Sequence, residues 1–248
     1  MKNIYIIAFF ITILISCNES VDNQTQPGVY GKPGEVLVVC NTDRWNSAIG
    51  DSLKAFLESE FLVLPRPESR FVVRHVDHSA FKNPYIYHRN ILFLSIDDSV
   101  KQPSIEAVKG KWSRNQLCIF IRANNNAGFY QLLENNKTNI IEHIEYADRK
   151  RKYRHYRHYK NEDISRQLKE YHIDMTIPVG FTLDEKCDTF LWMGSETPDL
   201  QREIIIYFYA YTDSTRLTKD FIISQRDSMA KYNVPGRARG TYMATEKQ

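Results

Sequence analysis

The sequence predicts an α+β protein in which helices cover mainly antiparallel sheets, in the order β-α-β-β-β-α-β-β-β-α. Three observations support this class. Short apolar runs bounded by polar turns predict strands, and longer stretches carry apolar residues at helical spacing. These elements form two groups, in each of which strands are followed by a helix. A single mixed sheet is the alternative arrangement.

The first group begins with a strand at residues 35–40, followed by a helix at 43–59 whose apolar residues recur at helical spacing. Thr42 or Asp43 can cap this helix. Further strands are predicted at 71–76, 90–96 and 116–122, and a short helix at 104–109 separates the last two. A long helix then starts near Phe129. It either continues through the basic segment toward Tyr171 or is interrupted near Asn161 and Asp163.

The second group contains predicted strands at 175–182, 189–194 and 203–211 and a closing helix at 218–231. The globular part is expected to span residues 34–248, with two halves at about 34–170 and 171–248 as an alternative division. Residues 17–33 are polar and carry no periodicity, so we expect a flexible tether there.

Composition places the chain among ordinary globular proteins, with 25% charged and 42% hydrophobic residues. A net charge of +3 is too small to indicate nucleic acid as a global partner. Cys40 and Cys118 lie in predicted buried strands, and Cys187 lies in a polar segment predicted as a turn. The cysteine spacing predicts neither a disulfide framework nor a metal site.

The amino terminus has the features of a lipoprotein signal. Lys2 precedes an apolar run at residues 4–15, and the small residue Ser16 stands directly before Cys17. The run is too short for a membrane-spanning helix, which needs about 20 residues. The pattern resembles a lipobox, which implies that residues 1–16 are removed and that Cys17 is acylated. Because Asn18 follows the cysteine, we expect an outer-membrane lipoprotein of the cell envelope.

Residues 50–53 spell Gly-Asp-Ser-Leu, the motif that carries the nucleophile of the GDSL esterases. In those enzymes the serine lies on a turn directly after the first strand and has a histidine partner near the carboxyl terminus. Here Ser52 falls within a helical pattern, and every histidine lies at or before His172. We therefore assign no catalytic role to Ser52.

Three histidines and one carboxylate lie close together in the sequence, where one strand ends and the next begins: His75, Asp77, His78 and His88. Imidazole and carboxylate groups ligate zinc, so this group is a candidate metal site. The alternative is that these side chains form ordinary hydrogen bonds, because His75 and His78 point to opposite faces if the strand continues.

A basic segment at residues 149–160 is the strongest local concentration of charge. Tyrosines recur every third residue at 153, 156 and 159, and the cations are Arg149, Lys150, Arg151, Lys152, Arg154, Arg157 and Lys160. Clusters of basic residues bind anionic head groups and acidic polysaccharides. The alternative is a solvated helix whose tyrosines pack on the sheet. The same choice applies to Tyr207, Tyr209 and Tyr211, which predict either a stacking platform or a face covered by a helix.

Several short motifs together resemble one known family. They are residues 31–36 (Gly-Lys-Pro-Gly-Glu-Val), Trp45 with residues 49–52, residues 88–91, Phe190 with Trp192, and residues 235–236 with 240–243. The family is a group of Bacteroidota lipoproteins catalogued only as a domain of unknown function. The resemblance covers nearly everything after the tether and implies no catalytic residues. Other members extend past the Tyr242–Met243 segment, which leaves open that this chain is a shortened member.

We therefore expect a lipid-anchored cell-envelope protein with a binding or accessory role, without a cofactor. Its expected partners are the membrane, reached through the lipid on Cys17, and an envelope protein or glycan. One alternative is a metal-assisted envelope hydrolase that uses the histidine group. The other is polyanion or membrane-surface binding through residues 149–160.

Overall fold

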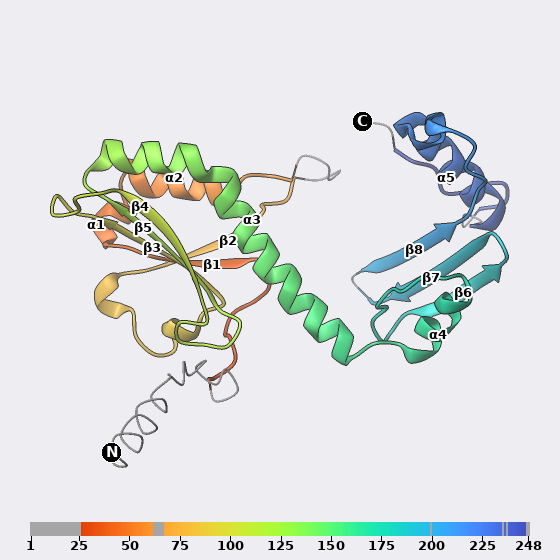
Figure 1. The fold of residues 1–248 in the computed structure, drawn as a ribbon, viewed down its shortest axis with the longest axis horizontal. Helices are drawn as coiled ribbons and strands as arrows, with labels where there is room; N and C mark the ends of the chain where they lie inside the picture. Colours follow the sequence, from red (N-terminus) through yellow and green to blue (C-terminus); the bar gives the residue numbers. More distant parts are fainter. Residues whose placement is uncertain (1–25, 62–66, 199, 235, 237, 247–248) are drawn as a thin grey trace, which may run out of the picture. The chain divides into compact units, whose positions relative to one another are not determined.

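A computed structural model of the chain describes residues 26–61, 67–198, 200–234, 236 and 238–246 (Figure 1). The chain divides into two compact units, with the boundary between Arg151 and Lys152. Cys17 and the predicted signal peptide lie outside the described residues. Within the described part, no helix is long and apolar enough to cross a membrane.

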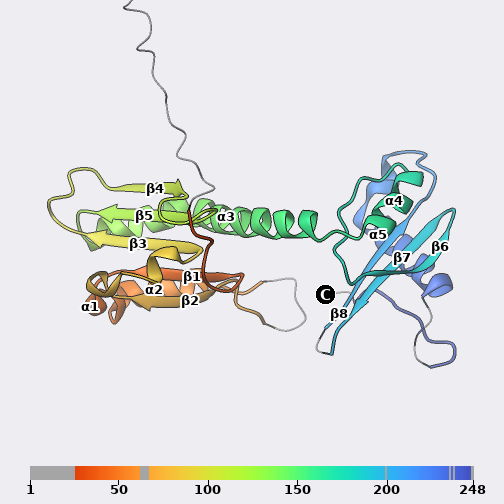
Figure 2. The same ribbon diagram turned by 90° about the horizontal axis from the view of Figure 1, so that it is seen from below.

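The first unit is built on a five-stranded sheet with the order β2-β1-β3-β5-β4 (Figure 2). Strands β1, β2, β3 and β5 run parallel to one another, and β4 pairs antiparallel with β5. The strands are β1 (Glu35–Val39), β2 (Val72–Val76), β3 (Asn90–Ile96), β4 (Ser104–Lys109) and β5 (Leu117–Ala123). The helices are α1 (Thr42–Trp45), α2 (Ala48–Leu57) and α3 (Asn126–His158).

The central strands of this sheet are buried on both faces, which explains their nearly continuous apolar sequences. Val36 and Val38 of β1 face a core that includes the apolar residues of α2 and α3. Leu37 and Val39 face the other side, where Phe81 and Trp112 cover the sheet from the connecting loops. Figure 1 shows α2 and α3 along the same face.

The second unit contains a three-stranded antiparallel sheet with the order β6-β7-β8. Ile164 and Leu168 of one helix pack against one face of this sheet together with Leu191 and Met193. A second helix approaches the other face, where the Phe221 ring lies 5.5 Å from the ring of Tyr209. The elements are α4 (Glu162–Glu170), β6 (Thr182–Cys187), β7 (Phe190–Glu196), β8 (Gln201–Tyr207) and α5 (Lys219–Asn233).

The predicted α+β class is confirmed, and the predicted order of elements broadly matches the structure. The chain forms two sheets, so the alternative of a single mixed sheet is wrong. Antiparallel pairing holds throughout the second sheet, whereas three of the four strand pairs of the first sheet are parallel. The parallel pair β1 and β2 is possible because α1 and α2 form the long crossover that parallel strands require.

Two local predictions are wrong. Residues 104–109 form the edge strand β4 instead of a helix, because Ile105 and Ala107 alternate with polar residues and face α3 across the sheet. Residues 175–181 are irregular, and the strand there is β6 at Thr182–Cys187, which places Cys187 at a strand end. Pro178, which lacks a backbone N–H, and Gly180, with φ of +88°, interrupt the earlier segment.

Candidate functional site

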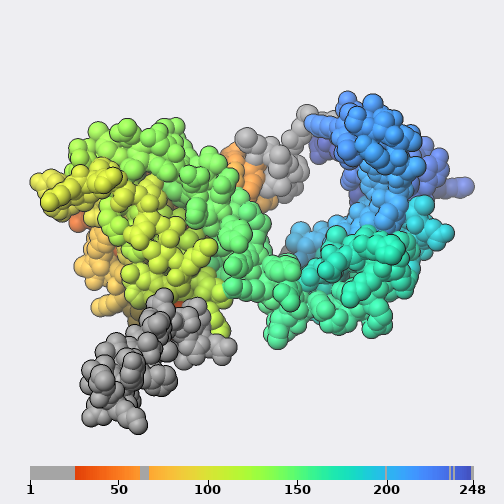
Figure 3. Space-filling view, viewed as in Figure 1, coloured from red at the N-terminus to blue at the C-terminus, as the bar shows by residue number. Residues whose placement is uncertain are grey.

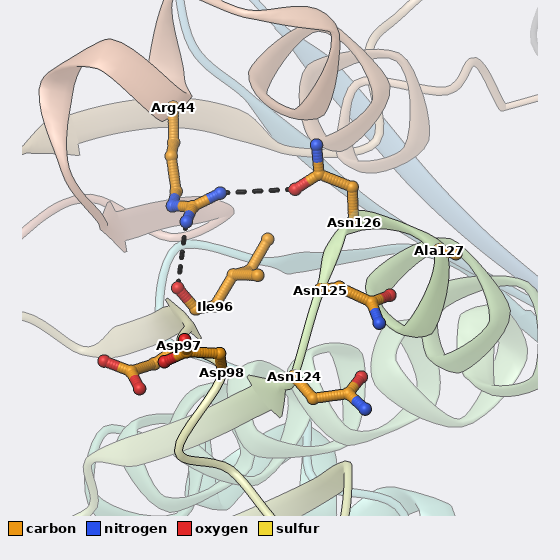
Figure 4. Close-up of a pocket in the computed structure, with 8 residues that line it drawn as sticks. All are labelled: Arg44, Ile96, Asp97, Asp98, Asn124, Asn125, Asn126 and Ala127. Carbon is orange, nitrogen blue, oxygen red and sulfur yellow. Dashed lines mark hydrogen bonds between the residues drawn. The ribbon is translucent and has the colours of Figure 1, made fainter.

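A shallow hollow of about 690 Å³ lies at the carboxyl ends of β3 and β5 in the first unit (Figure 4). Its position follows from the topology, because parallel neighbours end at the same edge of a sheet. From β1 the chain crosses over to β2 on one side of it, and the later strands β3 and β5 lie on the other side. The direction in which strands are added to the sheet therefore reverses at β1. Crevices outside the carboxyl ends of strands, next to such a reversal, are the usual ligand sites of open α/β sheets. The lining residues are Arg44, Ile96, Asp97, Asp98, Asn124, Asn125, Asn126 and Ala127.

The guanidinium of Arg44 connects two walls of the hollow. One of its nitrogens, Nη2, donates to the carbonyl oxygen of Ile96 at 2.9 Å, at the end of β3. Its Nη1 donates to Oδ1 of Asn126 at 3.3 Å, in the first turn of α3. These contacts hold a positive charge beside the carboxylates that follow β3.

The acidic wall consists of Asp97 and Asp98. Hydrogen bonds from the side chain and the backbone N–H of Ser99 lower the pKa of Asp97 below its ordinary value, so this carboxylate is ionised at neutral pH. The N–H of Ser99 donates to Oδ1 of Asp97 at 2.8 Å. The negative charge therefore lies on a turn that is fixed by its own hydrogen bonds.

The third wall is the polar sequence between β5 and α3. Oδ1 of Asn125 accepts from the N–H of Gly128 at 2.8 Å and thereby caps the start of α3. Asn124 and Asn126 are left at the rim with amide groups that both donate and accept hydrogen bonds. The lining contains no serine, cysteine or histidine. The hollow therefore offers one guanidinium, two carboxylates and three side-chain amides to a polar ligand.

The opposite, amino-terminal edge of the same sheet holds a buried polar network around Asp148 of α3. Oδ1 of Asp148 accepts from Nη2 of Arg151 at 2.6 Å and from Nη1 of Arg89 at 3.3 Å. Oδ2 accepts from the N–H of Gly34 at 3.1 Å. Asn90 accepts from Nη2 of Arg151 at 2.6 Å. The network ties α3 to the starts of β1 and β3 and has a structural role.

Part of the predicted tether is packed on this edge. Tyr30 exchanges backbone hydrogen bonds with Tyr87 and Arg89, and Arg114 donates to the carbonyl of Pro27. Gly31 has a φ of +97°, and a β-carbon there would lie 2.7 Å from Nε2 of His88. Residues 26–33 are therefore part of the fold of the first unit, which begins earlier than the predicted residue 34.

The four candidate metal ligands are held by separate partners. Nε2 of His75 lies 3.0 Å from the carbonyl of Cys40, and Nε2 of His78 lies 3.1 Å from the carbonyl of Leu94. Asp77 accepts hydrogen bonds from Thr42 and Ser79, which lower its pKa well below the ordinary value. His88 is buried at the other edge of the sheet. Among the described residues, no group of three or more His, Cys, Asp or Glu side chains can hold a metal ion.

The basic segment is divided between a buried and an exposed part. The Arg151 side chain is 10% exposed and belongs to the Asp148 network, so it is not available to a polyanion. Arg149 pairs with Glu145 at 3.2 Å, and Lys160 pairs with Glu162 at 3.1 Å. Lys150, Lys152, Arg154 and Arg157 are exposed along α3. The space-filling view shows side chains at the surface of this part of α3 (Figure 3).

The tyrosines of the basic segment do not all pack on a sheet. Tyr153 is 54% exposed and Tyr159 is 50% exposed, whereas Tyr156 is half-buried. In the second unit, two tyrosines of the row Tyr207, Tyr209 and Tyr211 make hydrogen bonds within the fold. The hydroxyl of Tyr207 donates to the backbone carbonyl oxygen of Ile222 at 3.2 Å, and that of Tyr209 donates to the backbone carbonyl oxygen of Arg216 at 3.1 Å. Tyr207 and Tyr209 therefore lie on a face covered by α5, whereas Tyr211 is 64% exposed.

The Gly-Asp-Ser-Leu motif has a structural explanation at each position. A β-carbon on Gly50 would lie 1.8 Å from the carbonyl oxygen of Trp45, so only glycine fits where α1 meets α2. Asp51 pairs with Lys54, and the Ser52 hydroxyl donates to the carbonyl of Ala48 at 2.7 Å. Leu53 is fully buried in the core. The motif belongs to helix α2.

The sequence alone does not identify the residues of the hollow as a site. The available signal was polar residues directly after two apolar strands, namely residues 97–98 after β3 and 124–126 after β5. These polar residues indicate a common site only when β3 and β5 are known to be parallel neighbours. The strand order is not visible in the sequence.

Comparisons with known proteins agree with the division into two units. A family model described as Domain of unknown function (DUF8532) matches residues 29–157. A second, described as Domain of unknown function (DUF4837), matches residues 160–248. No curated protein and no solved structure matches the chain. The expected resemblance to a domain of unknown function is confirmed, while the lipoprotein character and the bacterial group stay predictions.

Proposed function

We propose that this chain, which belongs to the family described as Domain of unknown function (DUF8532), is a lipid-anchored cell-envelope protein with a binding or accessory role. The lipid anchor is inferred from the amino-terminal sequence, in which a positive residue and an apolar run precede Ser16 and Cys17. Acylation of Cys17 attaches the chain to a membrane, most simply the outer membrane. The folded units then present a surface for a partner.

The position of the hollow supports a binding role. The chain enters the first unit along the amino-terminal edge of the sheet, where residues 28 and 30 bridge to Arg114 and His88. The hollow lies at the other edge, beyond the carboxyl ends of β3 and β5. A strand of seven residues, such as β3, spans roughly 20 Å. An anchor at Cys17 therefore leads to the edge of the sheet that is opposite the binding face.

The chemistry of the hollow favours a ligand rich in hydroxyl groups, such as an envelope glycan. Hydroxyl groups both donate and accept hydrogen bonds, and the hollow offers a guanidinium, three side-chain amides and two carboxylates. A strongly anionic ligand is disfavoured because Asp97 and Asp98 offset the charge of Arg44. An envelope protein that binds the same face is the other outcome of the test.

The anchor is tested by labelling cells with a palmitate analogue. We expect label on the wild-type chain and none on Cys17→Ala, which should also leave the membrane fraction. Cys187→Ala, which changes an exposed cysteine of the second unit, is the matched control and should keep the label. Equal labelling of the wild type and Cys17→Ala would refute the anchor.

The hollow is tested with the detergent-solubilised full chain on an array of envelope oligosaccharides and in a pull-down from membranes. Asp98→Asn removes a carboxylate acceptor from the rim and should weaken glycan binding about tenfold. Asp51→Asn changes an exposed carboxylate on α2 and should have no effect. If Asp98→Asn loses a bound protein instead of a glycan, the ligand of the hollow is an envelope protein. If Asp98→Asn binds glycans and proteins as the wild type does, the hollow is not a binding site.

A second candidate function is binding of an anionic surface through α3. The exposure of Tyr153 and Tyr159 beside Lys150, Lys152, Arg154 and Arg157 favours it. Neutralising these four cations with glutamine should weaken association with an acidic polysaccharide at least tenfold, and 0.5 M salt should do the same. The control neutralises Lys219 and Lys231 of α5. If the association is unchanged both by the four glutamine substitutions and by 0.5 M salt, this candidate function is wrong.

A further inference from the structure

Four exposed cations lie at the amino-terminal edge of the first sheet, on the side of β4 and β5. Lys109 ends β4, Lys111 and Arg114 lie in the turn that leads into β5, and Lys150 lies on α3. The Nζ atoms of Lys109 and Lys150 lie 5.6 and 5.9 Å from the ring centre of Tyr146. All of these residues belong to the first unit. The four cations form the basic edge of that unit.

Carboxylates do not neutralise the basic edge. None of its four cations forms an ion pair among the described residues. Glu145 and Asp148 of α3 each pair with two other guanidinium groups already. Glu142, one turn before Tyr146, is exposed, and counted in full it still leaves an excess of three positive charges. Three further exposed carboxylates of this edge precede β2, at the other end of the sheet: Glu58, Glu60 and Glu68.

The segment that leads from Cys17 into the fold is bound to the same turn (Figure 1). Nε2 of Gln26 donates to the carbonyl oxygen of Gly110 at 3.2 Å. The carbonyl oxygen of Pro27 accepts from the backbone N–H of Arg114 at 2.9 Å. Cys17 and Gln26 are nine residues apart in the sequence, and a chain of that length reaches at most about 30 Å. A lipid on Cys17 therefore keeps the turn close to the membrane surface.

We propose that the basic edge docks on the anionic phospholipid head groups of the membrane that holds Cys17, an inference that rests on the proposed anchor. Lysine and arginine side chains near an anionic lipid surface are attracted to it over about a Debye length. Tyr30 is 57% exposed and Tyr146 is 50% exposed, and the amphipathic ring of tyrosine suits the boundary between lipid and water.

The docked orientation gives the two edges of the first sheet different surroundings. A lipid chain and a basic patch together provide the two signals that stable membrane attachment requires. The amino-terminal edge then lies against the head groups, and the hollow at the carboxyl ends of β3 and β5 faces away from them. The basic edge shares only Lys150 with the basic segment at residues 149–160.

The test measures how fast a water-soluble reagent acetylates single lysines of the full-length protein in vesicles. The protein is purified from membranes and reconstituted with phosphatidylcholine alone or with about one-third phosphatidylglycerol. We expect acetylation of Lys109 and Lys111 to be at least about threefold slower in the anionic vesicles, because head groups cover these side chains. Lys101, which is exposed after β3, is the internal control and should react equally in both. Salt at 0.5 M should remove the difference.

A pair of substitutions tests whether the charge of the basic edge causes the protection. Arg114→Gln combined with Lys150→Gln keeps both reporter lysines and removes half of the charge, so the protection should fall at least about twofold. Lys219→Gln combined with Lys231→Gln removes the same charge from the second unit and should leave the protection unchanged.

The mass of the amino-terminal peptide from the same sample reports whether Cys17 is acylated, so failure of the anchor is distinguished from failure of docking. Equal acetylation of Lys109 and Lys111 in the two kinds of vesicle would overturn the proposal. Protection that survives loss of Arg114 and Lys150 would also overturn it. Protection by a soluble acidic polysaccharide, and none by phosphatidylglycerol, would assign the basic edge to a polysaccharide instead.

Discussion

The two edges of the first sheet use the same kinds of polar residues in opposite ways. At the amino-terminal edge, Asp148, Asn90 and Arg151 are buried and bonded to one another. At the carboxyl-terminal edge, Asp97, Asp98 and Asn124 border a hollow that is open to solvent. The first edge stabilises the unit, and the second is available to a ligand.

The type of a polar residue therefore does not decide its role. His88 belongs to a set of potential metal ligands by residue type, yet it is buried and bonded to the backbone of Asn90 at 3.0 Å. Asn124 belongs to no recognised motif, yet it lies at the rim of the hollow. Burial and the strand order separate the two cases. Four perturbations test this difference between the edges.

Removal of the Asp148 carboxylate is expected to have the largest effect. Asp148→Ala leaves the guanidinium groups of Arg89 and Arg151 partly buried without their common acceptor. Loss of one partner of a buried ion pair costs about 3 kcal/mol or more of the free energy of unfolding. Chemical denaturation measures this loss. Asp51→Ala, at an exposed carboxylate, should change the same quantity by less than about 0.5 kcal/mol.

A smaller effect is expected from acid at the same edge. Burial lowers the pKa of His88 below its ordinary value of 6.5, and the nearby Glu35 carboxylate only partly offsets this. As the pH falls, His88 is protonated near pH 6.5 in the unfolded chain and only at lower pH in the folded chain. The free energy of unfolding therefore decreases as the pH falls below about 6.5. Denaturation between pH 7.5 and 5 should show this slope in the wild type and in His143→Gln. A slope that persists in His88→Gln would contradict the assignment.

Loss of the Arg44 guanidinium should cost less, because the hollow is open to water. Arg44→Gln removes donors to Ile96 and Asn126, and we expect a loss of about 1 kcal/mol in the free energy of unfolding. Arg149→Gln, which breaks an exposed ion pair with Glu145, is the control and should cost less than about 0.5 kcal/mol. If Arg44→Gln lowered the free energy of unfolding as much as Asp148→Ala, the two edges would not differ in their contribution to stability.

The smallest effect is expected at Ser52. Its hydroxyl donates to the carbonyl of Ala48 within α2, a bond that adds little to a helix. Ser52→Ala should therefore change the free energy of unfolding by less than about 0.5 kcal/mol. A fluorophosphonate probe should label neither the wild type nor the variant. Labelling of the wild type that disappears in Ser52→Ala would show that the motif is catalytic after all.

The sequence predicts the elements whose apolar residues are numerous and periodic. Strands β1, β3 and β5 and helix α5 fall close to their predicted positions because burial imposes their patterns. Strand β4 was mistaken for a helix because an edge strand with only Ile105 and Ala107 turned toward α3 shows too few apolar residues to fix its period.

The candidate site was not predictable for a different reason. Arg44, Asp97 and Asn126 are far apart in the sequence and meet only because β3 and β5 are parallel neighbours and α1 follows β1 at the same edge. The burial of Arg151 depends likewise on where α3 crosses the start of β3. Local pattern identifies such residues as polar and leaves their environment undetermined.

Site-specific photo-crosslinking in intact cells tests most directly whether the carboxyl-terminal edge is the binding face. The photoreactive residue is placed at Asn125, in the hollow, or at Lys111, an exposed residue in the turn before β5 at the amino-terminal edge. We predict a discrete crosslinked species from Asn125 that is lost with Asp98→Asn, and none from Lys111. Crosslinks from Lys111 alone, or none from Asn125, would contradict the assignment of the two edges.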